Sequence, residues 1–182
     1  MTEYKYRAEI THTDKTVGEL YKTQYYLYDK TRVITRFLIG FALIITAIVF
    51  ALPLAVKGIL LLLGAWLVST PDFPSQIRAE RNLSARKTAL PVLSYEFFDD
   101  KMKIYGEGSG DIAYDKIQFL IFDKNYFYLF LSKNSACMID KNTISENTAE
   151  FMNFIEEKTK KKWRVQKSFL AMNLQDLKNL NF

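Results

Sequence analysis

The stretch FLIGFALIITAIVFALPLAVKGILLLLGAWLVS, residues 37–69, decides what kind of protein this chain can be. It contains a single ionisable side chain, Lys57. As one helix it would be about 50 Å long, whereas the hydrocarbon core of a bilayer is about 30 Å thick. A single span would leave about a third of this apolar surface in water, so two spans of roughly 17 to 20 residues each fit better.

Pro53 divides the two spans, because proline lacks an amide hydrogen and clashes with the preceding helical turn. We therefore predict a transmembrane helical hairpin over residues 33–72, with Lys57 near its tip. A cleavable signal peptide is the alternative, but a long polar segment precedes the apolar run and a second apolar run follows it at once. The small residues that would let two helices approach closely are Gly40, Ala47, Ala51, Gly58, Gly64, Ala65 and Ser69.

Positive charges flank this hairpin on the side of both chain termini, while the tip carries only Lys57. Lysine and arginine collect on the cytoplasmic side of membrane helices, so both termini are predicted to face the cytoplasm. The flanking cations are Lys22, Lys30, Arg32 and Arg36 before the hairpin, and Arg78, Arg81, Arg86 and Lys87 after it.

The composition argues against several kinds of chemistry. With 182 residues, the chain has room for one ordinary domain and a membrane anchor. Its net charge of +5 is explained by the cationic flanks, so no nucleic-acid partner is expected. Cys137 is the only cysteine and His12 the only histidine, and neither belongs to a metal-binding pattern. We therefore expect no metal, no cofactor and no enzymatic activity.

The segment before the hairpin predicts one strand and one helix. Residues 4–10, YKYRAEI, alternate in the manner of a strand. Apolar and aromatic residues then recur at spacings of three and four, which indicates an amphipathic helix leading into the membrane. These residues are Val17, Leu20, Tyr21, Tyr25 and Tyr28.

The segment after Pro91 reads as strands divided by turns, followed by one helix. The turn signals lie at residues 99–101, 106–110 and 123–125. Asn147 with Glu150 forms a capping-box pattern at the start of the helix. A terminal amphipathic helix can cover the open end of an antiparallel meander, so we predict a pleckstrin-homology-like (PH-like) β-barrel or sandwich closed by a C-terminal helix.

The strand at residues 4–10 is predicted to join this C-terminal sheet. An unpaired strand would expose a row of backbone donors and acceptors. Residues 91–140 contain only five or six strands by this interpretation, fewer than the seven of a PH-like barrel. The soluble domain would then be discontinuous in sequence, with the membrane hairpin inserted into it.

The segment LSYEFFDDKMKIYGEGSGDIAYDKIQFLIFDKNYFYLFLSKNSACMIDKNTI, residues 93–144, resembles the YcxB-like family. The likeness lies in its Phe-Asp-Asp turn, the Ile-x-Tyr-x-x-Ile strand, the Tyr-Phe-Tyr-Leu strand and the closing Ile-x-Lys. The resemblance implies a bacterial membrane protein with an N-terminal strand and helix, two membrane helices and a PH-like C-terminal domain. It extends over roughly residues 4–157 and implies no catalytic residues.

One basic segment is a candidate site, because several cations surround Trp163. Such a cluster next to the inner leaflet indicates a contact with anionic lipid headgroups, at about 1 kcal/mol per charge. The alternative is a solvated helix end whose lysines complement the helix dipole. The candidate residues are Lys158, Lys160, Lys161, Lys162, Trp163, Arg164 and Lys167.

The sequence thus predicts an α+β membrane protein. Its expected parts are an N-terminal strand and helix (1–32), a transmembrane hairpin (33–72), a basic connector (73–90), a PH-like domain (91–162) and a basic tail (163–182). The expected function is a PH-like binding or regulatory module tethered to the bacterial cytoplasmic membrane. Its expected partners are the bilayer, anionic headgroups and an unidentified membrane or cytoplasmic protein. The alternative is an accessory subunit that contacts a transporter or sensor through the hairpin.

Overall fold

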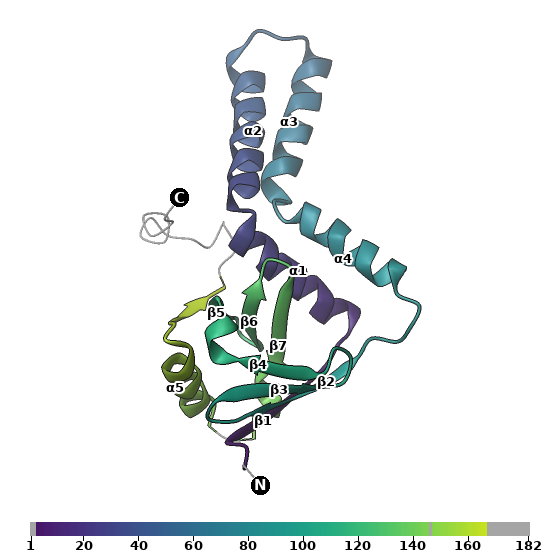
Figure 1. The fold of residues 1–182 in the computed structure, drawn as a ribbon. Helices are drawn as coiled ribbons and strands as arrows, with labels where there is room; N and C mark the ends of the chain where they lie inside the picture. Colours follow the sequence, from purple (N-terminus) through teal and green to yellow (C-terminus); the bar gives the residue numbers. More distant parts are fainter. Residues whose placement is uncertain (1–2, 146, 167–182) are drawn as a thin grey trace. The chain divides into compact units, whose positions relative to one another are not determined.

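The computed structural model describes residues 3–145 and 147–166 (Figure 1). The chain divides into two compact units. Unit 1 comprises Met1–Leu20 and Arg86–Phe182, and unit 2 comprises Tyr21–Ala85. Unit 1 is therefore assembled from the two ends of the chain, and unit 2 is inserted between them.

The first sheet of unit 1 is antiparallel and contains the N-terminal strand. Its strand order is β1 (Tyr6–Thr11), β2 (Val92–Phe97), β3 (Lys101–Tyr105) and β4 (Gly110–Ala113). Strand β1 pairs with β2 along its whole length, from Tyr6 opposite Phe97 to Thr11 opposite Val92. The prediction that residues 4–10 join the C-terminal sheet is confirmed.

The second sheet has the strand order β7 (Ser135–Asp140), β6 (Tyr126–Ser132), β5 (Phe119–Phe122) and β8 (Trp163–Val165). Strand β8 runs parallel to β5, so the start of the expected tail is a strand. Neither sheet closes into a barrel: the described strands of unit 1 form two separate four-stranded sheets. What the structure supports is a mixed α+β fold.

Hydrogen bonds from Thr143 and Ser145 nevertheless cover the free edge of β1. The Glu9 amide donates to Thr143 Oγ1 at 2.8 Å, and the Thr143 hydroxyl donates to the Glu9 carbonyl at 2.7 Å. The Arg7 amide donates to Ser145 Oγ at 3.2 Å, and the Ser145 amide donates to the Arg7 carbonyl at 3.0 Å. Thr143 and Ser145 follow β7 of the second sheet. The segment that leaves the second sheet therefore provides hydrogen-bond partners for backbone groups on the free edge of the first sheet.

Helix α5 (Thr148–Thr159) packs on both sheets of unit 1. Asn147 caps the helix as predicted, because its side chain accepts a hydrogen bond from the Ala149 amide at 2.9 Å. The ring of Phe151 lies 5.0 Å from Phe97 of the first sheet and 5.6 Å from Phe127 of the second, measured between centroids. All three rings are fully buried, so the core of unit 1 lies beneath α5.

Replacing Ile10 in β1 with alanine tests how much unit 1 depends on its N-terminal strand. Ile10 is 2% exposed, so we expect a loss of about 2–4 kcal/mol of stability. Cys137 is buried in β7 and is the chain's only cysteine, so a thiol reagent reaches it when unit 1 opens. Labelling of Ile10→Ala should be at least about thirtyfold faster than in the wild type.

Thr11→Ala is the matched control, since Thr11 lies in the same strand but is exposed. It should keep the wild-type labelling rate. Equal rates for Ile10→Ala and the wild type would mean that β1 is not part of the cooperative unit.

Unit 2 contains a close helical hairpin, α2 (Lys30–Val49) and α3 (Leu54–Ser69), drawn side by side in Figure 1. The two helices approach most closely at Gly40 and Gly64. A Cβ on Gly40 would lie 2.8 Å from Val68 Cγ2 and 3.0 Å from the Gly64 carbonyl oxygen. A Cβ on Gly64 would lie 2.7 Å from Ile44 Cγ1 and 2.8 Å from the Gly40 carbonyl oxygen. Any side chain at either position would push the helices apart.

The other small residues of the hairpin divide into two groups. Ala47 is 2% exposed and lies inside the hairpin, as predicted. A Cβ on Gly58 would meet nothing within 4 Å, and Ala51, Ala65 and Ser69 are exposed. The close contact therefore depends on a subset of the predicted residues. Pro53 directly precedes α3, where the helix break was predicted.

By length and composition, one described helix, α2, could cross a membrane by itself. Helix α3 passes the same test only together with α4 (Phe73–Ala85), which is bent from it by 66°. The described part of the chain thus offers one such helix, or two if the bent pair counts as a span.

Helix α4 occupies most of the segment that was expected to be a basic connector. Ser75 and Ala79 are 1% and 4% exposed, so one face of this polar helix is buried. The Ser75 amide and hydroxyl both donate to the Asp72 carbonyl, at 2.8 Å and 2.7 Å. Small buried residues, rather than an apolar stripe, define its inner face, which is why hydrophobic periodicity did not reveal it.

Alanine substitutions at Gly40 and Gly58 test the hairpin contact. Both changes raise the intrinsic helix propensity by about 1 kcal/mol. Gly58→Ala should therefore keep or raise the melting temperature of the helical circular dichroism signal in detergent. Gly40→Ala should lower it, because its Cβ meets a backbone carbonyl of the partner helix. If both variants melt above the wild type, the two glycines do not form a tight contact.

Candidate functional site

The predicted basic segment lies at the end of α5 and in β8, and its first cation is held by unit 1. Lys158 Nζ lies 2.9 Å from Asp99 Oδ1 and 5.5 Å from the centroid of the Phe154 ring. The same carboxylate oxygen is 2.9 Å from Lys5 Nζ. Hydrogen bonds from Lys158 and Lys5 lower the pKa of Asp99. Lys158 therefore helps to fasten α5 to the neighbouring turn.

The later cations of the segment differ in exposure. Lys160 is exposed and ends α5 in a left-handed conformation, with φ of 57°. Lys162 Nζ lies 2.5 Å from Glu156 Oε2. The Arg164 guanidinium lies 5.4 Å from the centroid of the Phe119 ring, and Arg164 is exposed. Lys161 is half-buried, and Lys167 lies outside the described residues.

Trp163, expected at the centre of a lipid contact, packs against unit 1. Its ring centroid lies 4.7 Å from that of Phe127 and 6.3 Å from that of Phe122. The indole Nε1 donates to the Met152 carbonyl at 3.0 Å, and the Trp163 amide donates to Glu156 Oε1 at 3.0 Å. The indole thus joins α5 to the second sheet. Among the described residues of the segment, Lys160, Lys162 and Arg164 are the exposed cations.

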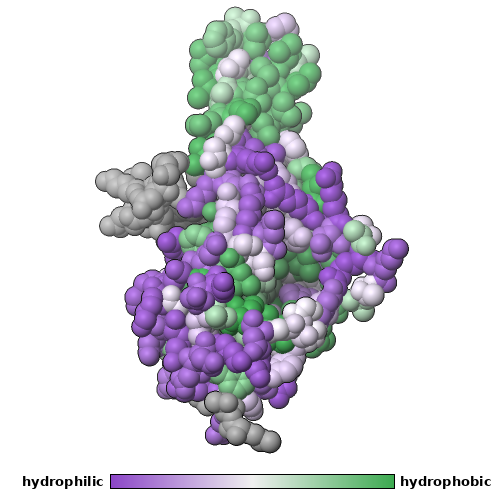
Figure 2. All heavy atoms as spheres, in the orientation of Figure 1, coloured by the Kyte–Doolittle hydropathy of each residue, from purple (hydrophilic) through white to green (hydrophobic). Residues whose placement is uncertain are grey.

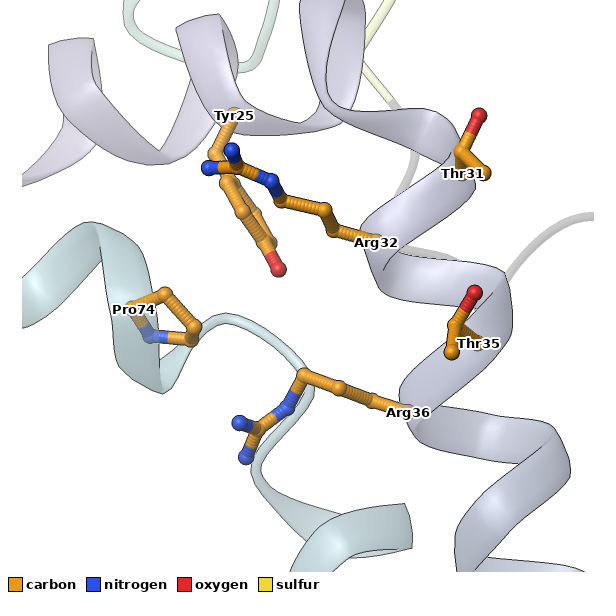
Figure 3. Close-up of a pocket in the computed structure, with 6 residues that line it drawn as sticks. All are labelled: Tyr25, Thr31, Arg32, Thr35, Arg36 and Pro74. Atoms are coloured by element: carbon orange, nitrogen blue, oxygen red, sulfur yellow. The ribbon is translucent and has the colours of Figure 1, made fainter.

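A second candidate site is a pocket of about 330 Å³ at the start of α2, within unit 2. Figure 3 shows Arg32 and Arg36 reaching from the first turns of α2 towards Tyr25 of α1 (Asp14–Tyr28) and Pro74 of α4. The two arginines are four residues apart, so they lie on the same face of the helix. The lining residues are Tyr25, Thr31, Arg32, Thr35, Arg36 and Pro74.

Guanidinium groups outnumber carboxylates around this pocket. Asp29 Oδ2 lies 2.9 Å from Arg78 Nη1, whereas Asp29 Oδ1 is 3.9 Å from Arg32 Nη1. Arg36 Nη2 donates to the Thr70 carbonyl at 3.3 Å, and its Nε is buried with no hydrogen-bond partner. Arg32 and Arg78 therefore share the Asp29 carboxylate, Arg36 contacts a backbone carbonyl, and the six lining residues include no carboxylate.

Tyr25 contributes a buried hydroxyl to the same pocket. The residue is 0% exposed and its hydroxyl has no hydrogen-bond partner. The Arg78 guanidinium lies 5.9 Å from the centroid of the Tyr25 ring. Burial raises the pKa of Tyr25, so the hydroxyl stays protonated and can donate a hydrogen bond.

Sequence reasoning did not find this pocket. It treated Arg32 and Arg36 as cations that flank the hairpin, and Tyr25 as part of an amphipathic helix, without bringing them together in one site. The Arg-x-x-x-Arg spacing just before an apolar helix was the available signal. The contribution of Pro74 depends on the turn after α3, which the sequence does not specify.

The thiol of Cys137 and the potential metal ligands among the described residues bear on nucleophilic and metal chemistry. Cys137 is buried, and burial raises its pKa to about 12, so the thiolate is disfavoured. No group of three or more His, Cys, Asp or Glu side chains among the described residues could hold a metal ion.

Comparison with known proteins identifies one family. Residues 97–155 match the family model described as YcxB-like protein, which confirms the resemblance over this segment. The match runs from the end of β2 into α5 and does not include the hairpin or the arginine pocket. Comparisons with curated proteins and with solved structures found no match.

Replacing Trp163 with alanine separates a packing role from a surface role. Because the indole packs on Phe127 and bonds to Met152, we expect a loss of about 3 kcal/mol of stability. Labelling of Cys137 should be roughly a hundredfold faster than in the wild type. Lys160→Gln, three residues earlier and exposed, should leave the rate unchanged. A wild-type rate for Trp163→Ala would mean that the indole adds nothing to the fold.

Proposed function

We propose that the chain is a binding or regulatory module tethered to a bacterial cytoplasmic membrane, with α2 and α3 embedded in the bilayer. The observation that carries the proposal is the exposed surface of the hairpin. Among the described residues, 18 large hydrophobic side chains are exposed, and 14 of them lie between Leu38 and Trp66. Figure 2 shows the resulting apolar surface in green. A surface of this kind in water would be a strong aggregation site, whereas lipid tails cover it without cost.

The pairing of β1 with β2 supports two crossings rather than one. Thr11 pairs with Val92, so both ends of the inserted segment lie on the same side of any membrane. A chain that leaves and returns on one side crosses an even number of times. If α2 crosses, the segment containing α3 must cross back.

The helix lengths are consistent with this arrangement. Helix α2 has 20 residues and would be about 30 Å long, which equals the thickness of the hydrocarbon core. Helix α3 has 16 residues and would be about 24 Å long. A helix shorter than the hydrocarbon core can still span it when flanking cations extend their side chains to the headgroups. Lys57, near the tip of the hairpin, can do this. At the other end, the Arg36 guanidinium lies 5.4 Å from the centroid of the Trp66 ring, a pairing suited to the interface.

The charge asymmetry supports the orientation. Both chain ends and unit 1 would face the cytoplasm, because the cations flank the base of the hairpin and only Lys57 lies near the tip. We further propose that unit 1 is PH-like. Its meander, the hydrogen bonds from Thr143 and Ser145 to β1 and the packing of α5 on both sheets support that proposal.

In this proposal, unit 1 presents a protein or lipid site next to the inner leaflet, and no catalytic role is assigned. The exposed cations Lys160, Lys162 and Arg164 would contact anionic headgroups. The alternative, an accessory subunit of a transporter or sensor, would place the exposed face of the hairpin against protein helices. Gly40 and Gly64, the positions of tightest packing, already hold the two helices of the hairpin together. This favours lipid, rather than other protein helices, as the contact of the exposed face.

A topology experiment tests the proposal. In a Cys137→Ser background, Lys57→Cys should react with an impermeant maleimide added to intact cells. Asn134→Cys, on the exposed turn between β6 and β7, should react only after lysis. The result follows from the charge asymmetry across the hairpin. Labelling of Asn134→Cys in intact cells would reverse the orientation, and equal labelling of both positions only after lysis would overturn the membrane hairpin.

A further inference from the structure

We propose that the pocket at the start of α2 binds the phosphate group of an anionic phospholipid. The proposal rests on the membrane hairpin for the source of the ligand, but the phosphate chemistry stands on the pocket alone. Arg32, Arg36 and the Tyr25 hydroxyl would be its donors (Figure 3). Thr31 and Thr35 of α2 also line the pocket.

The donors in the pocket match a phosphate. A planar guanidinium presents several N–H donors that suit phosphate oxygens, and such charge-assisted bonds are stronger than neutral ones. The lining residues contain two arginines and no carboxylate. An anion is therefore attracted and a cation repelled. The volume of about 330 Å³ falls in the range of small-ligand sites.

The internal contacts of unit 2 leave part of this donor capacity unused. Arg36 reaches a carbonyl at 3.3 Å while its Nε has no partner, and Tyr25 is fully buried with an unpartnered hydroxyl. A buried donor without a partner destabilises the fold, because it loses its bonds to water and gains none in the protein. A bound phosphate oxygen would remove that cost, which is the physical reason to expect a ligand between these groups.

The place of the pocket along α2 favours a lipid as the carrier of the phosphate. Its arginines lie within five residues of Phe37, where the apolar run begins, so they would lie at headgroup depth if α2 spans the bilayer. Ile39 follows Arg36 by three residues on the same helical face and is 49% exposed. An acyl chain attached to the bound phosphate would continue along this face.

The full chain in nanodiscs provides the test. Trp66 lies beside Arg36, so in a Trp163→Phe background its fluorescence reports a brominated lipid bound at the pocket. The nanodiscs contain phosphatidylcholine with a small mole fraction of one brominated lipid. Brominated phosphatidylglycerol should quench the fluorescence of Trp66, whereas the same mole fraction of brominated phosphatidylcholine should not. Arg32→Gln and Tyr25→Phe should each require roughly tenfold more phosphatidylglycerol, the loss expected for one bond to a charged group.

Two matched controls separate the pocket from general surface charge. Arg81→Gln removes an exposed cation of α4, and Tyr21→Phe removes a hydroxyl from α1, both outside the pocket. Both should quench as the wild type does. If Arg81→Gln weakens quenching as much as Arg32→Gln does, surface charge explains the effect and the site is refuted.

The stability of Tyr25→Phe distinguishes a ligand site from a structural role. Without anionic lipid, removing an unpartnered hydroxyl should leave the melting temperature in uncharged detergent unchanged or higher. With phosphatidylglycerol added, the wild type should gain stability and Tyr25→Phe should gain less. A lower melting temperature for Tyr25→Phe without lipid would overturn the proposal.

A separate arm identifies the source of the phosphate. Inorganic phosphate is added to the chain in uncharged detergent, with chloride at equal ionic strength as the reference. Stabilisation by phosphate that Tyr25→Phe abolishes, without any preference for phosphatidylglycerol, would assign the pocket to a soluble phosphate ester. This arm does not require a bilayer, so it remains informative if the topology experiment fails. No response to either phosphate or phosphatidylglycerol would refute the site.

Discussion

The pairing of β1 with β2 is the constraint on which the rest of the chain depends. A strand near the start of the sequence pairs with one near its middle, in register from Tyr6 opposite Phe97 to Thr11 opposite Val92. Everything between these strands must leave unit 1 and return to it. Because the two ends of the insertion lie next to each other, a helical hairpin fits better than a single membrane crossing. The stability of unit 1 also depends on a pairing between strands that are distant in sequence.

The two long helices of the inserted unit approach most closely where each has a glycine, with Val68 and Ile44 packed around the contact. Gly40 and Gly64 face each other, and their backbone carbonyls occupy the space that side chains would need. In lipid, the hydrophobic effect does not drive helices together, so helices associate through close backbone packing of this kind. Most large apolar side chains between Leu38 and Trp66 are exposed, which is the reverse of the pattern in unit 1, where Phe97, Phe127 and Phe151 are fully buried.

Much of this fold could be predicted from the sequence because its signals are local. The break at Pro53, the cap at Asn147 and the strand at residues 4–10 each depend on a few neighbouring residues. Helix α4 could not be predicted, because its buried face consists of the small residues Ser75 and Ala79. The separation of the strands into two open sheets, with β8 parallel to β5, depends on long-range packing and not on strand pattern.

The candidate sites show the same division between local and tertiary information. The basic run around Trp163 could be read directly from the sequence, but the packing of its indole on Phe127 could not, since the partner lies on another strand. The arginine pocket is the opposite case. Its donors come from α1 and α2, its far wall is Pro74 of α4, and only the turn after α3 brings that wall into place. Neither Arg36 Nε nor the Tyr25 hydroxyl has a hydrogen-bond partner in the fold. Two unpartnered buried groups from residues that line one pocket are the reason for proposing a ligand there.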